Sequence, residues 1–202
     1  MTKPKIKNRE DALYALAESQ GGYFTSADAK SAGYTYPLQH FHVQRGKWLR
    51  VDRGVYRLKH FPTVDHEDLF RWWLWSQKKG VISHESAATV YDLGDILPSQ
   101  VHLTVPLNFR KKAIKGVVLH KAKLESGDVE TREGFAVTSP LRTILDLAAK
   151  KLDPERLTMI VKDAVHKGLV ERRALLAVLE KVPNWIDPAT QVTLQLALRE
   201  KE

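Results

Sequence analysis

The fold is decided by residues 22–58, which read GYFTSADAKSAG (22–33), YTYPLQHFHVQR (34–45) and GKWLRVDRGVYRL (46–58). In the first block, Thr25 or Ser26 can cap a helix that runs to residue 32, because a hydroxyl oxygen there accepts a hydrogen bond from an unpaired backbone N–H group of the first turn. Gly33 suits the left-handed residue that ends such a helix. The first block therefore predicts one short helix.

The second block predicts another helix after a tight turn. Thr35 is its expected N-cap, and Pro37 is tolerated in the first turn, where its missing N–H group is not needed. We expect Leu38, Phe41 and His42 to face the core, because positions i, i+3 and i+4 share one side of a helix. This assignment leaves five residues on or near the outer side: Tyr36, Gln39, His40, Val43 and Gln44.

The third block predicts a β-hairpin. Residues 48–51 and 55–58 are rich in β-prone side chains, and they flank Asp52-Arg53-Gly54, in which the glycine can adopt a positive φ. An amphipathic helix is also expected at residues 9–19. Three helices followed by such a hairpin make a winged helix-turn-helix, with the hairpin as its wing.

The composition changes after a linker at residues 60–63, where Pro62 cannot continue a strand ladder. We therefore expect two domains, a winged helix-turn-helix at residues 1–62 and a mixed α+β domain at residues 63–202 with a helical C-terminal half. The fold class is α+β. In the second domain we expect strands at 81–83, 101–105, 117–120 and 135–138, and helices at 65–79, 84–93, 141–150, 154–167, 171–181 and 188–199.

The positive charge of the chain is concentrated at one end. The 202 residues carry a net charge of +8, and residues 1–62 contain 11 Lys and Arg against 5 Asp and Glu. A polyanion such as DNA is attracted to such a segment, because each neutralised phosphate releases condensed counterions. The other interpretation is a surface charge that serves solubility. A second basic stretch, residues 96–124, is either a solvated loop and hairpin or a further phosphate-binding patch.

The absence of cysteine excludes disulfides and thiolate chemistry and fits a reducing compartment. No apolar run approaches the roughly 20 residues that a bilayer-spanning helix needs, and the first residues lack the apolar core of a signal peptide. We therefore expect a cytoplasmic protein.

In a helix-turn-helix the last helix enters the major groove, where side chains read base edges. Gln39 and Gln44 can bond adenine, since an amide both donates and accepts, and His40 can donate to guanine. Tyr36 and Val43 could contact a thymine methyl group. The alternative for this set is an ordinary polar helix surface.

The expected wing supplies the basic contacts. Arg53 lies at its tip, where an arginine can enter a narrow minor groove, and Arg50 and Arg57 are expected to bind phosphates. Lys47 precedes the first strand, and Thr25 and Ser26 could hold a phosphate at the start of their helix. The candidate DNA-binding residues are therefore Thr25, Ser26, Tyr36, Gln39, His40, Val43, Gln44, Lys47, Arg50, Arg53 and Arg57.

The sequence contains few of the motifs that mark enzyme active sites. The sequence has neither a P-loop nor a Gly-x-Gly-x-x-Gly motif. Ser83-His84-Glu85 are consecutive, so they cannot line up as nucleophile, base and orienting carboxylate; Ser83 is better explained as a helix cap. No two histidines have the His-x-x-x-His spacing that binds metal on a helix. We expect no enzyme, no cofactor and no metal site.

Several segments resemble a known family. They are residues 21–26 (GGYFTS), the Arg53-Gly54-Val55-Tyr56 wing with its flanking residues 46–58, and residues 82–88 (ISHESAA), 101–106 (VHLTVP) and 137–147 (VTSPLRTILDL). With these segments the chain is similar to AbiEi-family antitoxins of type IV toxin–antitoxin systems, over roughly residues 10–170. The wing segment is the most specific of them.

The resemblance implies a bacterial transcriptional autorepressor that binds inverted repeats in its own promoter, with self-association on the DNA. It implies a partner toxin of the nucleotidyltransferase type, encoded nearby and held in no stable complex, and a second domain needed for antitoxicity. Two alternatives remain open. The second domain could neutralise the toxin by direct contact, or the chain could be a nucleic-acid enzyme that uses Asp128 and Glu130, near Glu133.

Overall fold

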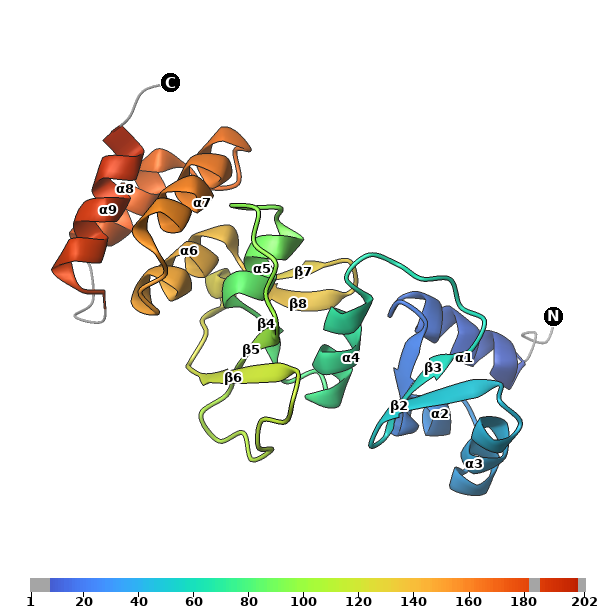
Figure 1. Cartoon of the computed structure of the whole chain (residues 1–202). Coiled ribbons are helices and arrows are strands. Elements are labelled where there is room, and N and C mark those ends of the chain that lie inside the picture. The colour runs from blue at the N-terminus through green and yellow to red at the C-terminus, as the bar shows by residue number, and fades with distance from the viewer. Residues whose placement is uncertain (1–7, 182–185, 200–202) are drawn as a thin grey trace, which may run out of the picture. The chain divides into compact units, whose positions relative to one another are not determined.

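The computed structural model describes residues 8–181 and 186–199 (Figure 1). The first element is helix α1 (Arg9–Glu18). It is followed by β1 (Tyr23–Thr25), α2 (Ser26–Ser31), α3 (Tyr36–Gln44), β2 (Trp48–Asp52) and β3 (Val55–Leu58). This order confirms the predicted winged helix-turn-helix. The sheet has one strand more than the hairpin, because β1 pairs antiparallel with β3 and gives the strand order β1-β3-β2.

The turns form where the sequence predicts them. The Thr25 hydroxyl accepts from the Asp28 N–H at 3.0 Å while the Asp28 carboxylate accepts from the Thr25 N–H at 2.8 Å, a reciprocal cap that starts α2. Gly54 has a φ of 75°, which allows the chain to reverse between β2 and β3. Thr35 precedes α3 with Pro37 in the first turn, as expected.

An aromatic core holds these elements together. Phe24 and Trp48 meet edge to face with ring centroids 4.8 Å apart, and Tyr34 lies 5.0 Å from Trp48. Leu13 and Ala17 of α1 complete the cluster from the other side. All five side chains are buried, and each of the four larger ones contributes on the order of 1–3 kcal/mol of apolar transfer free energy.

Helix α4 (Glu67–Trp75) packs against β1 and β3, so the first compact unit extends to Lys79 and also includes Thr131–Phe135. The expected boundary after residue 62 is therefore corrected. The reason is that α4 is strongly amphipathic and needs a surface for its buried residues Leu69, Phe70, Trp72, Leu74 and Trp75.

A mixed sheet with strand order β6-β5-β4-β8-β7 belongs to the second compact unit, except for residues 131–135 at the turn between β7 and β8, which are part of the first unit. Strand β4 runs antiparallel to β5 and parallel to β8, and β5 runs parallel to β6. The strands are β4 (Val81–Ile82), β5 (Val101–Val105), β6 (Val117–Lys121), β7 (Val129–Arg132) and β8 (Phe135–Thr138). Strand β7, like β1, was not expected from the sequence.

Helices complete this unit and confirm the helical C-terminal half (Figure 1). Helix α5 (His84–Val90) packs against β5 and against α6 (Pro140–Ala149), and α6 contacts α7 (Pro154–His166). A short 3-10 turn, η1 (Ser126–Asp128), precedes β7, and α8 (Arg172–Glu180) and α9 (Pro188–Arg199) end the described chain.

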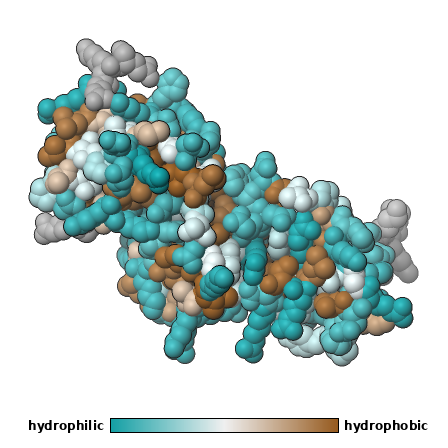
Figure 2. Space-filling model, viewed as in Figure 1, coloured by the Kyte–Doolittle hydropathy of each residue, from teal (hydrophilic) through white to brown (hydrophobic). Residues whose placement is uncertain are grey.

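Hydrophilic side chains predominate on the face that Figure 2 shows, and the apolar ones form scattered patches between them. Among the residues that the structure describes, no helix has the length and apolar character needed to cross a bilayer.

Candidate nucleic-acid interface

The outer side of α3 is formed by Tyr36, Pro37, His40, Phe41 and Gln44, all of which are exposed. Tyr36 is 65% exposed and Phe41 49% exposed, which are high values for aromatic side chains. The Arg45 guanidinium lies 5.3 Å from the centre of the Phe41 ring. The exposed side of α3 therefore carries one amide, one imidazole and two aromatic rings that a groove could accept.

Gln39 does not belong to this surface, which corrects the sequence interpretation. Its side chain is 2% exposed, its Nε2 donates to the carbonyl oxygens of Tyr34 at 2.9 Å and Ser26 at 3.1 Å, and its Oε1 accepts from the Ser26 hydroxyl at 2.6 Å. These bonds use the whole amide to join α2 to α3. Gln39 is therefore a structural residue and cannot read a base in this conformation.

The helix is rotated relative to the expected orientation. Val43 is partly buried against the aromatic core, whereas Phe41, which was expected inside, points outward. His42 does face inward as expected, and its ring stacks on Trp48 with centroids 4.8 Å apart. Val43 is therefore removed from the candidate contacts.

Thr25 and Ser26 are also occupied by internal hydrogen bonds. The Thr25 hydroxyl donates to the Asp28 carboxylate at 2.8 Å as well as capping α2, and the Ser26 N–H donates to the Gly54 carbonyl oxygen at 2.9 Å. The Ser26 hydroxyl is already committed to Gln39. A phosphate clamp built from these two residues is therefore not available, and their role is to fix α2.

Three of the four basic residues predicted to contact DNA from the wing are exposed to solvent. Lys47, Arg50 and Arg53 are exposed, and Arg53 lies in the turn between β2 and β3 beside Gly54. Among the described residues, none of these three side chains forms an ion pair. Their charges are thus available to a ligand such as a phosphate backbone.

Arg57, the fourth, is used within the protein. Its side chain is 11% exposed, its Nη2 forms an ion pair with Glu67 at 3.0 Å and donates to the Pro62 carbonyl oxygen at 3.1 Å, and its guanidinium lies 5.6 Å from the centre of the Tyr23 ring. The prediction that Arg57 grips a phosphate is therefore wrong. Arg57 instead connects β3 to α4.

The acidic residues of the segment 26–58 are neutralised internally. Asp52 pairs with Arg71 of α4 at 3.5 Å, and Asp28 caps α2 and lies 3.7 Å from Lys78. Five basic residues of the same segment have no acidic partner within the described chain: Lys30, Arg45, Lys47, Arg50 and Arg53. The helix-turn-helix and wing therefore present a surface of uncompensated positive charge.

Residues Arg110, Lys112 and Lys115 of the other basic stretch are exposed on the loop between β5 and β6. This loop borders an open pocket of about 640 Å³ that is lined also by Phe109 and Leu119. Both earlier interpretations, a solvated loop or a phosphate-binding patch, are compatible with this exposure.

The carboxylates considered for catalysis have separate partners. Asp128 pairs with Arg142 at 3.2 Å, and Glu133 lies 3.1 Å from the His66 ring. Glu130 accepts from the Tyr91 hydroxyl at 3.3 Å.

The Ser83-His84-Glu85 segment does not form a triad either. The Ser83 hydroxyl lies 3.0 Å from His84 Nδ1, but Glu85 pairs with Lys150 and His102. Ser83 occupies the N-cap position of α5 as expected, although its hydroxyl makes no capping bond.

Comparisons with known proteins bear on the first unit and on the fold. The fold of the chain is similar to that of the RV2827C protein from Mycobacterium tuberculosis, whose crystal structure aligns with a TM-score of 0.57 and 16% sequence identity over 100% of this chain and 84% of that one. The comparison with curated proteins gives no match. A family model described as "Transcriptional regulator, AbiEi antitoxin" matches residues 11–59. The helix-turn-helix and wing of this chain therefore match the AbiEi antitoxin family of transcriptional regulators, as the sequence resemblance predicted.

Proposed function

We propose that the chain is a sequence-specific DNA-binding autorepressor that acts as the antitoxin of a type IV toxin–antitoxin system. The observation that carries the proposal is the exposed outer side of α3 next to the unpaired Lys47, Arg50 and Arg53. An exposed recognition helix beside a basic hairpin suits a duplex, because the helix fits a major groove while the basic side chains contact phosphates. The family match at residues 11–59 supports the same function.

The contacts divide into two kinds. Gln44 and His40 carry the donors and acceptors that distinguish base pairs in the major groove, and Tyr36 offers an apolar ring edge to a thymine methyl group. Arg53 at the wing tip suits the minor groove, and Lys47 and Arg50 suit the backbone. The first kind would set which operator is bound, and the second would set how tightly any duplex is bound.

The partners follow from the same proposal. The DNA is an inverted repeat in the chain's own promoter, and the toxin is a nucleotidyltransferase-type protein encoded beside it, with which no stable complex forms. The second unit would serve antitoxicity. The setting is the cytoplasm, with no catalytic role for the chain.

The test is a fluorescence-anisotropy titration with two labelled duplexes, one from the upstream promoter and one with the same bases in scrambled order. The full chain should bind the promoter duplex at least about tenfold more tightly, since specific sites usually exceed non-specific ones by far more than this. Arg53→Ala should weaken binding to both duplexes. Arg173→Ala, which removes the same charge from the exposed surface of α8, is the matched control and should change neither.

Equal affinity for the two duplexes would refute sequence-specific repression. Co-purification of the neighbouring toxin with the chain would favour the alternative in which the antitoxin works by direct contact.

A further inference from the structure

Three histidines that are far apart in sequence converge in the second compact unit. They come from three elements: His84 from the start of α5, His102 from β5 and His120 from β6. One ring nitrogen of each lies within 4.8 Å of one ring nitrogen of each of the others. Among residues 8–181 and 186–199, this is the one group of three or more His, Cys, Asp or Glu side chains found so close together.

The sheet brings two of them together. In the parallel pair of β5 and β6, Thr104 lies opposite His120, and His102 is two residues from Thr104 on the same side of the sheet. His102 and His120 are therefore diagonal neighbours, and His102 Nδ1 lies 3.1 Å from His120 Nε2. The His84 ring stacks on that of His120 with centroids 3.6 Å apart.

The rings are held by neighbours that orient them. A carboxylate oxygen of Glu85 lies 3.0 Å from His102 Nδ1, and Glu85 is itself fixed by Lys150 at 3.0 Å. The Ser83 hydroxyl lies 3.0 Å from His84 Nδ1. His102 Nδ1 therefore faces both Glu85 and His120 Nε2. A carboxylate or hydroxyl beside an imidazole fixes the tautomer and the orientation of the ring, as it does around the histidine ligands of metal ions.

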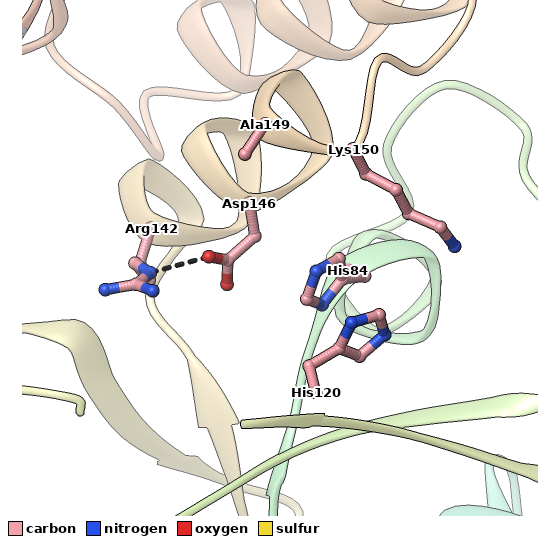
Figure 3. Close-up of a pocket in the computed structure, with 6 residues that line it drawn as sticks. All are labelled: His84, His120, Arg142, Asp146, Ala149 and Lys150. Carbon is pink, nitrogen blue, oxygen red and sulfur yellow. Dashed lines mark hydrogen bonds and ion pairs between the residues drawn. The ribbon is translucent and has the colours of Figure 1, made fainter. Parts of the chain in front are cut away.

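Unsatisfied polar atoms lie beside the cluster. His84 and His120 line a pocket of about 440 Å³ together with Asp146, Arg142 and Lys150 (Figure 3). Asp146 is 6% exposed, and its carboxylate is directed into this pocket. Its Oδ1 pairs with Arg142 at 2.8 Å, but its Oδ2 is buried without a hydrogen-bond partner.

Thr104, the register partner of His120, also has a buried hydroxyl without a partner. Buried oxygens are rarely left unpaired, so these two atoms point to a missing ligand or ion.

We propose that His84, His102 and His120 form a binding site for one divalent transition metal ion of the zinc class. Three imidazoles favour such an ion over Mg²⁺ or Ca²⁺, which prefer oxygen ligands. Zinc commonly takes a fourth ligand from water or a carboxylate, and Asp146 is a buried carboxylate that lines the same pocket and has an oxygen without a hydrogen-bond partner. The site is separate from the DNA-binding residues proposed above.

The site escapes a search of the sequence for paired ligands. His84, His102 and His120 are 18 residues apart at each step and lie on different elements, so no short spacing reveals them. The expectation that the chain has no metal site was based only on the spacing of histidines along helices. In the structure, two of the three histidines are brought together by the register of β5 and β6 instead.

The test uses the full chain with any polyhistidine tag removed, after treatment with EDTA and desalting. Co²⁺ is titrated as a spectroscopic probe, and Zn²⁺ is then titrated against a chromophoric chelator. We expect one ion per chain, with the intense visible absorption of four-coordinate Co²⁺ that Zn²⁺ displaces. Six-coordinate Co²⁺ absorption, or no stoichiometric binding at micromolar metal, would overturn the proposal.

Variants locate the site. His120→Ala should lower the affinity by tenfold or more. Glu85→Gln, which keeps the shape of the side chain, should lower it by about 10–100-fold because it removes the carboxylate charge beside the His102 ring. His60→Ala, at an exposed histidine of the first unit, is the matched control and should bind as the wild-type chain does. Wild-type affinity in both His120→Ala and Glu85→Gln would overturn the proposal. If His120→Ala does not fold, Glu85→Gln and the wild-type Co²⁺ spectrum still decide it.

Discussion

The hydroxyl of Ser26 donates a hydrogen bond to the side-chain oxygen of Gln39 at 2.6 Å, and this contact joins α2 to α3. The Gln39 amide then donates to two backbone carbonyl oxygens, those of Tyr34 and Ser26. The angle between the two helices of a helix-turn-helix decides which side of the second one faces the groove. Gln39 therefore acts on DNA binding through the helix pair rather than through a base.

Replacing Gln39 by alanine should destabilise the first unit. The change leaves the carbonyl oxygen of Tyr34 without its donor and the Ser26 hydroxyl without its acceptor, which should cost about 1–3 kcal/mol of unfolding free energy. Urea denaturation measures this loss. Gln44→Ala, on the exposed side of the same helix, is the control and should change stability by less than about 0.5 kcal/mol.

Base-pair specificity should depend on Gln44 and not on Gln39. Gln44→Ala should relax the preference at one base pair of the operator by about 1–3 kcal/mol, because one bidentate contact is lost. Gln39→Ala should leave the pattern of preferences unchanged once the unfolded fraction is accounted for. A panel of singly substituted operator duplexes checks this, and a relaxed base pair in Gln39→Ala alone would show that our orientation of α3 is wrong.

The Arg57–Glu67 ion pair leads to a prediction about stability. Glu67→Ala should lower the unfolding free energy by about 1–2 kcal/mol, since it leaves a buried guanidinium without its charge partner, while the partial exposure of Glu67 limits the loss. Arg57→Ala should destabilise the chain without reducing the salt dependence of DNA binding. If Arg57→Ala instead reduced that dependence as Arg53→Ala does, Arg57 would be a phosphate contact after all.

His42 should make the stability of the first unit depend on pH. Burial, then Lys47 and Arg9, lower the pKa of His42 below its ordinary value of 6.5, and its Nδ1 is buried without a hydrogen-bond partner. The unfolded chain therefore takes up a proton at higher pH than the folded chain does. The stability contributed by the neutral ring is fully present above the pKa of the unfolded chain, and it is lost progressively as the pH falls from that value through the lower pKa of the folded chain.

The measurement compares unfolding free energies at about pH 7.5 and about pH 5.5 for the wild-type chain and for His42→Phe, which keeps an aromatic ring on Trp48. The wild-type chain should lose more stability than the variant on acidification. Equal losses would show that His42 titrates alike in the folded and unfolded chain.

The sequence predicts local structure in this protein better than it predicts which side chains are free. Strands at 101–105 and 135–138 and the helix at 188–199 have the expected bounds, because apolar patterning and proline or glycine signals mark them. The strands β1 and β7 were missed, since they are only three and four residues long and their own composition does not mark them as strands. Strand β1 pairs with the distant β3, and β7 pairs with its neighbour β8.

Four of the errors in the candidate site have the same physical cause. Gln39, Thr25, Ser26 and Arg57 are polar, and a polar residue near a binding surface is expected to face the ligand. In the structure each one instead satisfies a backbone or charged group that folding has buried. These partners come from elsewhere in the fold, as Glu67 of α4 does for Arg57. The order of residues in the sequence does not show which side chains will be paired in this way.

The most direct test of the central claim is the salt dependence of binding to the promoter duplex, compared between the wild-type chain and a variant in which Lys47, Arg50 and Arg53 are all replaced by alanine. The slope of log K against log salt should be less steep in the variant by about 0.9 for every phosphate contact removed. The Arg173→Ala control should retain the wild-type slope. A variant with the wild-type affinity and slope would contradict the assignment of the wing and recognition helix as the DNA-binding surface.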